Sequence, residues 1–447
     1  DPSATRGRAD FGLAPRRFSA SLPDERSALQ DYPAGQTTER NTLSDQSHKP
    51  SAPRGLLALL TAAAFLIFAQ AFMIAPILPR LGAAFGTTSE PVGLAIPAYL
   101  VPYGLMTLVW GPLSDRVGRR PVILGSLAAF AVLTAGTALT HSLGTFIAMR
   151  SLTAIGASGV VPIALALIGD TFPFQRRGHA LGWLFGGMAG GIAVGSTAGA
   201  IAEPYIGWPG LFTGAAAGGF VLLSVAVTTP ALPAGQRPAT PVPLRAVAAG
   251  YRKLLRNPRG RATYSYVFIN AVLHSGVYTW LGLYLHERFE LGPVGIGLAL
   301  LGYGIPGFLL GPVIGRLVDR IGRAWMIPGG VALGAGCALL LATPLPLLGA
   351  ALAITALSLG YDMTQPPLGG IVTDLPGNRG QAMGLNVFTL FTGFGLGSLA
   401  FQALLPAGFS IALSVFGLAA LLAALAAIPL FRAEQPSAVP SRRERRI

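Results

Sequence analysis

Long charge-free runs separated by short charged turns dominate the sequence. Residues 91–114 and 121–149, for example, contain no Asp, Glu, Lys or Arg. Each run is long enough to cross ~30 Å of hydrocarbon as a helix that rises ~1.5 Å per residue. The turn between these runs holds four charged residues, Asp115, Arg116, Arg119 and Arg120. The pattern predicts two membrane-spanning helices joined by a tight basic turn at a membrane surface.

The charged turn occurs twice. The sequence GPLSDRVGRR begins at Gly111, and GRLVDRIGR begins 204 residues later at Gly315. Further residues match at the same spacing, which predicts that the chain consists of two related halves. The matching pairs include Asp115 with Asp319, Arg116 with Arg320, Gly118 with Gly322, Arg119 with Arg323, and Asp170 with Asp374.

The first turn resembles the Gly-x-Leu-Ser-Asp-Arg-x-Gly-Arg-Arg signature between helices 2 and 3 of the major facilitator superfamily. The second resembles the degenerate copy between helices 8 and 9. The resemblance covers about residues 55–431. It implies an all-α membrane protein with twelve transmembrane helices in two pseudo-symmetric six-helix bundles. It also implies a substrate site between the halves near the middle of the membrane, with alternating access by rocking.

The apolar runs divide into twelve expected spans. They are about 55–79, 91–110, 121–139, 143–168, 178–201, a sixth that ends near Thr229, 262–286, 293–315, two from residue 324 onward that divide at Thr343, and two within 380–431 that divide at Pro406. The expected domains are a disordered cytoplasmic tail (1–54), a first bundle (55–229), a Pro-rich and then basic cytoplasmic linker (230–261), a second bundle (262–431) and a basic cytoplasmic tail (432–447).

The net charge of +14 invites a nucleic-acid reading, but the basic residues fall in alternate loops and form no continuous face. With the N-terminus in the cytoplasm, the five cytoplasmic loops hold 16 Lys and Arg residues, against only Arg80 and Arg288 outside. This excess predicts that both termini are cytoplasmic. We expect a monomeric, multi-pass protein of the cell inner (plasma) membrane, in contact with the lipid bilayer and not with nucleic acid.

The sequence carries no enzyme signature. The five histidines have no zinc-site spacing, and neither a Gly-x-Ser-x-Gly elbow nor a phosphate-binding loop occurs. Cys337 is the only cysteine, which excludes a disulfide framework and a thiolate metal cluster. We expect a protein that is not an enzyme, without metal or cofactor, and driven by a proton gradient.

The resemblance implies that the charged turns act as a latch on the cytoplasmic side. Asp115 would lie near the start of helix 11, where the helix dipole favours negative charge, and the arginines would pair with Asp170 at the end of helix 4. A loop that only sets topology is the alternative. The expected latch residues are Asp115, Arg116, Arg119 and Asp170 in the first half and Asp319, Arg320 and Asp374 in the second.

Arg150 lies about seven residues, or ~10 Å, inside the external end of helix 4. A charge within the membrane is costly and indicates function, here contact with an anionic or polar substrate or tuning of a proton-carrying acid. An arginine that extends outward to the interface is the alternative. The segment from Ala75 to Pro79 resembles the end of helix 1 in drug-efflux members, which often carry an Asp where this chain has Gln70.

Asp362 is the one acid placed well inside a span, 12 residues before Asp374 and hence ~18 Å along the helix. Burial favours the neutral form of a carboxyl, so Asp362 is the candidate proton carrier. An acid that only bonds neighbouring helices is the alternative. His274 shares a helical face with Asn270 and Tyr278, and this face predicts either a cavity lining or a buried histidine bonded to a neighbour.

Helix 5 has a glycine at every fourth position, which leaves one face free of side chains and lets another helix approach closely. These glycines are Gly187, Gly191, Gly195 and Gly199. The segment 191–200 resembles the Gly-x-x-x-Gly-Pro-x-x-Gly-Gly motif of proton-coupled antiporters, with Ser196 and Ala200 in place of Pro and the last Gly. Ordinary helix packing is the alternative.

These features predict a secondary transporter that exports a small organic solute, drug- or sugar-like, by proton-coupled alternating access. An uptake symporter or facilitator of the same fold for a small metabolite is the alternative. A polytopic membrane enzyme or sensor would need a catalytic cluster or a folded soluble domain, and the sequence shows neither.

Overall fold

Helices make up almost all of the chain that the computed structural model describes, and no strand occurs in that part. It comprises residue 53 and residues 55–172, 174–233 and 243–434. The expected N-terminal tail, part of the linker and most of the expected C-terminal tail lie outside the described residues. So do a few side chains, at 174–178, 244, 307, 308, 311, 312, 315 and 319.

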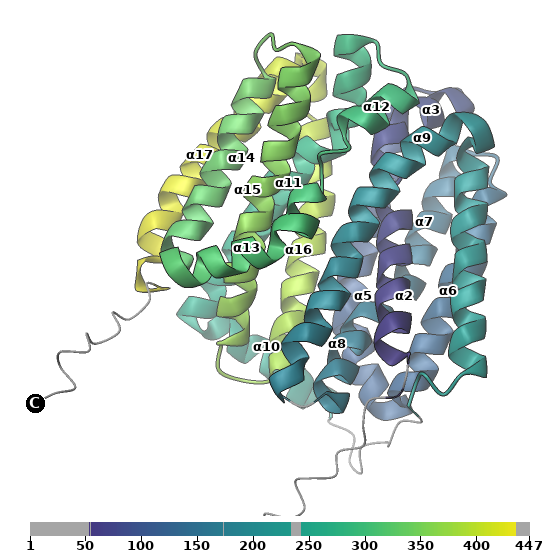
Figure 1. Cartoon of the computed structure of the whole chain (residues 1–447), viewed down its shortest axis with the longest axis vertical. Coiled ribbons are helices and arrows are strands. Elements are labelled where there is room, and N and C mark those ends of the chain that lie inside the picture. Colours follow the sequence, from purple (N-terminus) through teal and green to yellow (C-terminus); the bar gives the residue numbers. More distant parts are fainter. Residues whose placement is uncertain (1–52, 54, 173, 234–242, 435–447) are drawn as a thin grey trace, which may run out of the picture. The chain divides into compact units, whose positions relative to one another are not determined.

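The helices follow the order of the expected spans (Figure 1). Before the linker they are α2 (Leu56–Phe72), η1 (Ala75–Ile77), α3 (Leu78–Ala84), α4 (Ser89–Gly93), α5 (Pro97–Val117), α6 (Arg119–Ala138), α7 (Leu143–Ala157), α8 (Val160–Thr171) and α9 (Phe174–Thr228). After it come α10 (Leu244–Arg256), α11 (Pro258–Phe289), α12 (Pro293–Ala299), α13 (Ile305–Ile321), α14 (Arg323–Leu341), α15 (Leu347–Thr373), α16 (Arg379–Gln402), η2 (Leu405–Ala407), α17 (Phe409–Leu430) and η3 (Arg432–Glu434).

Nine segments of the described chain are long and apolar enough to cross a membrane. One of them, within α9, is 50 residues long and could supply two crossings, because Gly207 (φ 66°, ψ 165°) interrupts it. Two expected spans are not among the nine. α11 carries many polar side chains, and α13 is only 17 residues long. The prediction of an all-α membrane protein is confirmed, whereas the number of twelve spans stays an expectation.

Three segments differ in detail from what the sequence predicted. The first span breaks after α2, near Pro76 and Pro79, which cannot donate backbone hydrogen bonds. The eighth is divided into α12 and α13 by a break that ends at Gly304, whose φ of 82° favours glycine. The basic linker contains α10, a helix with one buried face that includes Leu254. A prediction from long apolar runs misses short breaks and amphipathic helices.

The two charged turns have the same backbone geometry. Gly118 has φ 99° and ψ 152°, and Gly322 has φ 88° and ψ 156°. Glycine adopts this region far more readily than other residues. Each glycine ends one helix and begins the next, α5 to α6 and α13 to α14. The internal repeat is therefore visible in the backbone as well as in the sequence.

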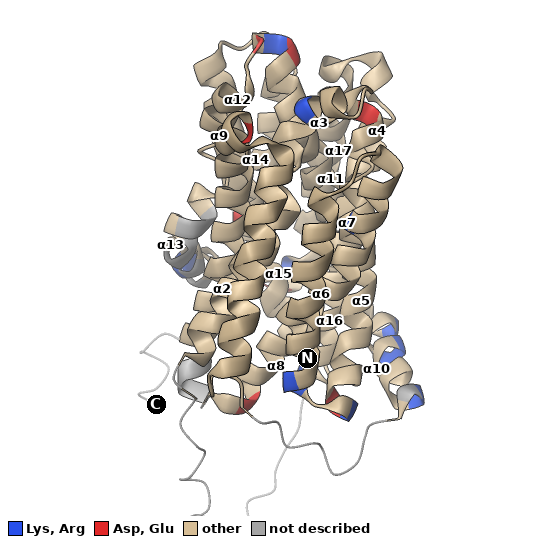
Figure 2. Cartoon of the chain, turned by 90° about the vertical axis from the view of Figure 1, so that its right-hand side faces the viewer, with Lys and Arg blue, Asp and Glu red and all other residues tan. Residues whose placement is uncertain are grey.

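Helix packing joins the two sides of the linker. α2 packs along α9, and α14 packs against both α15 and α17, whereas α16 contacts both α5 and α11. The contact between α5 and α16 connects a helix that precedes the linker to one that follows it. Charged residues lie mainly toward the ends of the long helices, as a membrane-spanning arrangement requires (Figure 2).

Glycines bring helices from the two sides of the linker into close contact. A Cβ atom at Gly282 would lie 2.8 Å from the Cα of Pro76, and one at Gly297 would lie 3.0 Å from the Thr197 carbonyl oxygen. One at Gly395 would lie 2.5 Å from a methyl of Val101. These contacts join α11 to η1, α12 to α9 and α16 to α5. We refer to them as the glycine contacts.

Candidate functional site

Arg150 caps the end of α2. Its Nη2 donates to the carbonyl oxygen of Ala71 at 3.1 Å, and Nη1 approaches that of Gln70 at 3.5 Å. Carbonyl groups in the last turn of a helix lack the N–H partners of interior ones, and the helix dipole favours a cation there. The arginine side chain is 0% exposed. It therefore lies inside the protein and does not extend to the membrane interface.

A buried polar cluster surrounds this arginine. The Arg150 guanidinium lies 4.1 Å from the ring centroid of Tyr99, and the Tyr99 ring stacks on that of Tyr103 at 6.0 Å. Gln70 adjoins the same guanidinium through its carbonyl group. We call these four residues the Arg150 cluster: Gln70, Tyr99, Tyr103 and Arg150. All of them come from elements that precede the linker.

Aromatic side chains connect the Arg150 cluster to the second half of the chain. The Tyr103 ring stacks on the Phe391 ring of α16 at 4.6 Å between centroids. The Phe68 ring of α2 contacts the same Phe391 ring edge-on at 5.8 Å. Farther along, Phe72 contacts Tyr278 of α11 at 6.0 Å and Phe394 of α16 at 6.4 Å. These rings fill the junction between the halves, where a transporter of this fold is expected to bind its substrate.

The histidine expected to line a cavity lies in a second aromatic group. The His274 ring stacks on Tyr361 at 3.8 Å, and its Nε2 hydrogen-bonds to the Tyr303 hydroxyl. Tyr303 in turn stacks on Tyr278 at 4.2 Å. Asn270 donates to the Thr364 hydroxyl at 2.8 Å. The polar face of α11 is therefore largely satisfied by α15 and by the segment between α12 and α13.

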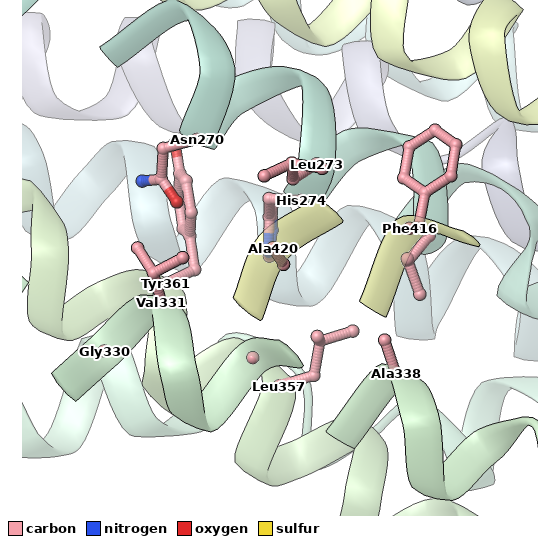
Figure 3. A pocket seen from close by; sticks show the side chains of 12 residues that line it. Asn270, Leu273, His274, Gly330, Val331, Ala338, Leu357, Tyr361, Phe416 and Ala420 are labelled. Carbon is pink, nitrogen blue, oxygen red and sulfur yellow. The ribbon is translucent and has the colours of Figure 1, made fainter. Parts of the chain in front are cut away.

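Asn270 and His274 also line a small cavity of about 30 Å³, together with apolar residues of α14, α15 and α17 (Figure 3). A cavity of that size has room for roughly one or two water molecules. It lies among helices that follow the linker, so it is not the junction between the halves. Tyr278 is not part of its lining.

Asp362 is partly buried on α15, and its carboxylate accepts a hydrogen bond from the Ser358 hydroxyl at 3.3 Å. The Ser358 oxygen also accepts the backbone N–H of Gly304 at 3.0 Å. The Ser358 side chain therefore connects the Asp362 carboxylate to Gly304, where the break between α12 and α13 ends. The described contacts of Arg150 go to α2 and Tyr99, so a pair between Arg150 and Asp362 is not among them.

A short ion pair lies at the charged turn of each half. Arg119 pairs with Asp170 at 2.8 Å and lies 4.0 Å from Asp115. At the repeat position, Arg323 pairs with Asp374 at 2.6 Å. Arg323 rather than Arg320 thus contacts Asp374, because Arg323, like Arg119, begins the helix after the turn. The Asp319 side chain lies outside the described residues.

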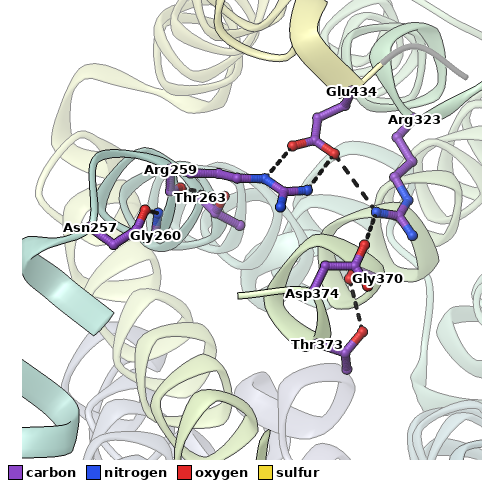
Figure 4. A network of polar contacts seen from close by, with 9 residues as sticks. All are labelled: Asn257, Arg259, Gly260, Thr263, Arg323, Gly370, Thr373, Asp374 and Glu434. Atoms are coloured by element: carbon purple, nitrogen blue, oxygen red, sulfur yellow. Dashed lines mark hydrogen bonds and ion pairs between the residues drawn. The ribbon is translucent and has the colours of Figure 1, made fainter. Parts of the chain in front are cut away.

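A larger charge network surrounds the second pair (Figure 4). Glu434 of η3 lies 3.7 Å from Arg323 and binds Arg259 at the start of α11 through two bonds of 2.6 and 2.8 Å. The hydrogen bond to Glu434 raises the pKa of the Arg259 guanidinium, so this residue stays charged. Glu434 lies in the segment 432–447, which the sequence predicted only as a basic tail, so this role was not expected. An isolated acid directly after a long apolar run is the signal that could have revealed it.

The four glycines that were expected in the fifth span lie in α9 and face α2. A Cβ atom at Gly191 would lie 2.3 Å from the Phe65 carbonyl oxygen, and one at Gly195 would lie 2.3 Å from that of Ala69. Those at Gly187 and Gly199 would lie 2.7 and 3.0 Å from side-chain atoms of α2 and of Met73 just after it. Any larger residue at Gly191 or Gly195 would force the two backbones apart.

A family model described as Major Facilitator Superfamily matches residues 60–398 and 290–446. A chloramphenicol resistance protein of Pseudomonas aeruginosa is 37% identical over 141 residues, which are 31% of this chain and 34% of that protein. Citrate exporter 1 of Aspergillus niger is 28% identical over 236 residues, 48% of this chain and 45% of that protein. The match thus spans less than half the length of either relative.

A solved structure of a POT family transporter in complex with 5-aminolevulinic acid has a TM-score of 0.71 and 15% identity to this chain. The alignment covers 85% of this chain and 96% of the other. At 15% identity, this similarity indicates a shared fold and nothing about the substrate.

Proposed function

The chain belongs to the major facilitator superfamily, and on that premise we propose that it exports a small organic solute in exchange for protons across the cell membrane. A multi-pass membrane transporter of this family is not an enzyme, and it binds its substrate without changing it. Two relatives are named a resistance protein and an exporter, which favours export. The proposed localisation is the inner (plasma) membrane, with the protein acting as a monomer.

One observation carries this proposal. A fully buried arginine joins a stack of aromatic rings that crosses from the first half of the chain to the second. Such a charge is costly to bury, so its position at the junction favours a role in binding or transport. Movement of one half relative to the other would open the stack to one side of the membrane at a time.

Inside-out vesicles provide the direct test. With the vesicle interior acidified, an exporter driven by protons accumulates solutes from a compound panel, and collapse of the pH gradient stops accumulation. Accumulation only in right-side-out vesicles would instead support an uptake symporter. Movement that ignores the pH gradient and never exceeds equilibrium would support a facilitator.

The charge pairs at the two turns are proposed to hold the cytoplasmic side closed in one state. The Asp170 side chain is 59% exposed, and exposed ion pairs contribute about 0–1 kcal/mol. Asp170→Asn and Arg119→Gln are therefore expected to slow transport by roughly two- to fivefold, not to abolish it. The double variant should be no slower than either single variant, because both remove the same pair.

Asp115→Asn is expected to act in the same direction, since its carboxylate lies at the edge of this pair. Arg120→Gln is the matched control. It removes one charge from the same turn, and Arg120 takes part in none of the ion pairs described there. Transport rates in vesicles and cysteine-accessibility labelling check both effects. Equal transport rates for the parent protein and all four single variants would show that the turn only sets topology.

Single-cysteine labelling tests the proposed orientation. Cys337 is buried, and Cys337→Ser supplies a background without cysteine. In that background, Tyr205→Cys, at a side chain 80% exposed beside the kink in α9, should react with a membrane-impermeant maleimide on intact cells. Arg256→Cys, at the end of α10, should react only after the cells are opened. If Arg256→Cys reacted on intact cells and Tyr205→Cys reacted only in opened cells, the prediction that both termini are cytoplasmic would be wrong.

A further inference from the structure

The Arg150 cluster contains polar atoms that have no hydrogen-bond partner although they are buried. They are both amide atoms of Gln70, the hydroxyl oxygens of Tyr99 and Tyr103, and Nε of Arg150. None of the four side chains is more than 1% exposed. Folded proteins satisfy almost all buried polar groups, so five partnerless atoms in one place require an explanation.

The residues that carry these atoms lie next to one another. Nη1 of Arg150 lies 3.5 Å from the backbone carbonyl oxygen of Gln70, and the guanidinium lies 4.1 Å from the centroid of the Tyr99 ring, which stacks on Tyr103. The Tyr103 ring also stacks on Phe391 across the junction. Through the Tyr103 ring, the Arg150 cluster is thus part of the wall that would be uncovered when the two halves separate.

The chemistry of this wall selects one class of ligand. Arg150 carries a positive charge, no described ion pair neutralises it, and the carbonyl ends of α2 offset it only in part. N–H and O–H groups of Gln70, Tyr99 and Tyr103 can all donate to an anionic oxygen. The adjoining rings of Tyr103 and Phe391 offer faces for stacking.

We propose that the Arg150 cluster binds an aromatic organic anion as the transported substrate. The acidic group takes hydrogen bonds from Nε of Arg150, the Gln70 amide and the tyrosine hydroxyls, and the ring replaces Phe391 as the stacking partner of Tyr103. An organic cation is repelled by Arg150, and an aliphatic anion gains no stacking. This inference rests on the proposed transport function and narrows its substrate class.

Binding measurements on the full-length protein in lipid nanodiscs test the class directly. Four probes separate charge from aromaticity: 2-naphthoate, 2-naphthalenemethanol, (2-naphthylmethyl)trimethylammonium and cyclohexanecarboxylate. We expect 2-naphthoate to bind at least about tenfold more tightly than each of the others. Equal or tighter binding of the cation or the neutral alcohol would overturn the proposal.

Two variants remove only partnerless groups, so they should fold as well as the parent protein. Gln70→Leu keeps a similar volume, and Tyr103→Phe removes one hydroxyl and keeps the ring. Each is expected to weaken 2-naphthoate binding by about tenfold, whereas binding of 2-naphthalenemethanol should change little. Thr134→Val is the matched control, because its hydroxyl is equally buried and partnerless but belongs to α6.

Unchanged 2-naphthoate binding in both variants would mean that the partnerless atoms serve no anion, and the proposal would fail. Arg150→Lys should retain more binding than Arg150→Gln, although both changes also disturb the cap of α2. Transport of other solutes in inside-out vesicles, with no binding of 2-naphthoate, would refute the substrate class and leave the export function standing. If 2-naphthoate binds and the variants weaken that binding, but no pH-driven transport occurs, the export function would be refuted and the ligand class would stand.

Discussion

Asp362→Asn is expected to abolish uphill, pH-driven transport while substrate binding and downhill exchange stay measurable. Asparagine cannot bind and release a proton, but its amide oxygen can still accept the hydrogen bond that Ser358 donates at 3.3 Å. The fold around α15 should therefore survive the change. In vesicles, the ratio of internal to external solute should fall to one, and the pH dependence of binding should disappear.

Glu290→Gln is the control for this result, because Glu290 is an exposed acid outside the spans. It should transport like the parent protein. Ser358→Ala removes the hydroxyl that joins Asp362 to the N–H of Gly304, and should shift the pH profile while leaving some coupling. Uphill transport by Asp362→Asn would exclude this acid as the coupling group. Loss of folded protein in that variant would support its purely structural alternative.

Gly195→Ala is expected to have the largest effect on folding. Its new methyl carbon would lie 2.3 Å from the carbonyl oxygen of Ala69, which is backbone and cannot rotate away. Overpacking of a tight core typically costs about 1–3 kcal/mol, and this clash is more severe than a side-chain overlap. The thermal stability of the protein in detergent, measured as the folded fraction by size-exclusion chromatography after heating, should fall clearly. Gly191→Ala should behave in the same way.

The same helix provides the control for this experiment. A Cβ atom at Gly186 meets nothing within 4 Å, and the same holds for Gly182. Since alanine is favoured over glycine within helices by about 1 kcal/mol, these two variants should be neutral or slightly more stable. The opposite signs of Gly186→Ala and Gly195→Ala separate helix propensity from helix contact. Equal stability of the two variants would show that α2 and α9 are not in close contact.

The repeat made part of the candidate site predictable. Because positions 204 residues apart share their backbone geometry, the match of Asp170 with Asp374 correctly indicated that each acid would meet an arginine of its own turn. The choice of arginine in the second half needed the structure. Only Arg119 and Arg323 start the next helix, and spacing within a turn does not show which side chain points toward a distant acid.

Other parts of the site depend on contacts between distant segments, which no local pattern encodes. The cap that Arg150 forms on α2 joins residues about 80 positions apart, and it exists only because the first span breaks near Pro76. Glu434 and Arg259 are 175 positions apart. Apolar runs predicted the class of protein well because they report only on the membrane. They contain no information on which polar groups meet inside it.

The glycine contacts at Gly282, Gly297 and Gly395 bear on how repeatably such a protein can cycle. Interdigitated large side chains would have to change rotamer before two surfaces part, and again when they return. A glycine leaves one side of each contact without a side chain, so the two surfaces interdigitate less there and can separate and close more nearly as rigid bodies. If the halves rock as proposed, this side of the molecule should show little hysteresis. At these contacts, the rate of opening would then be set by the movement of whole helices rather than by the repacking of single side chains.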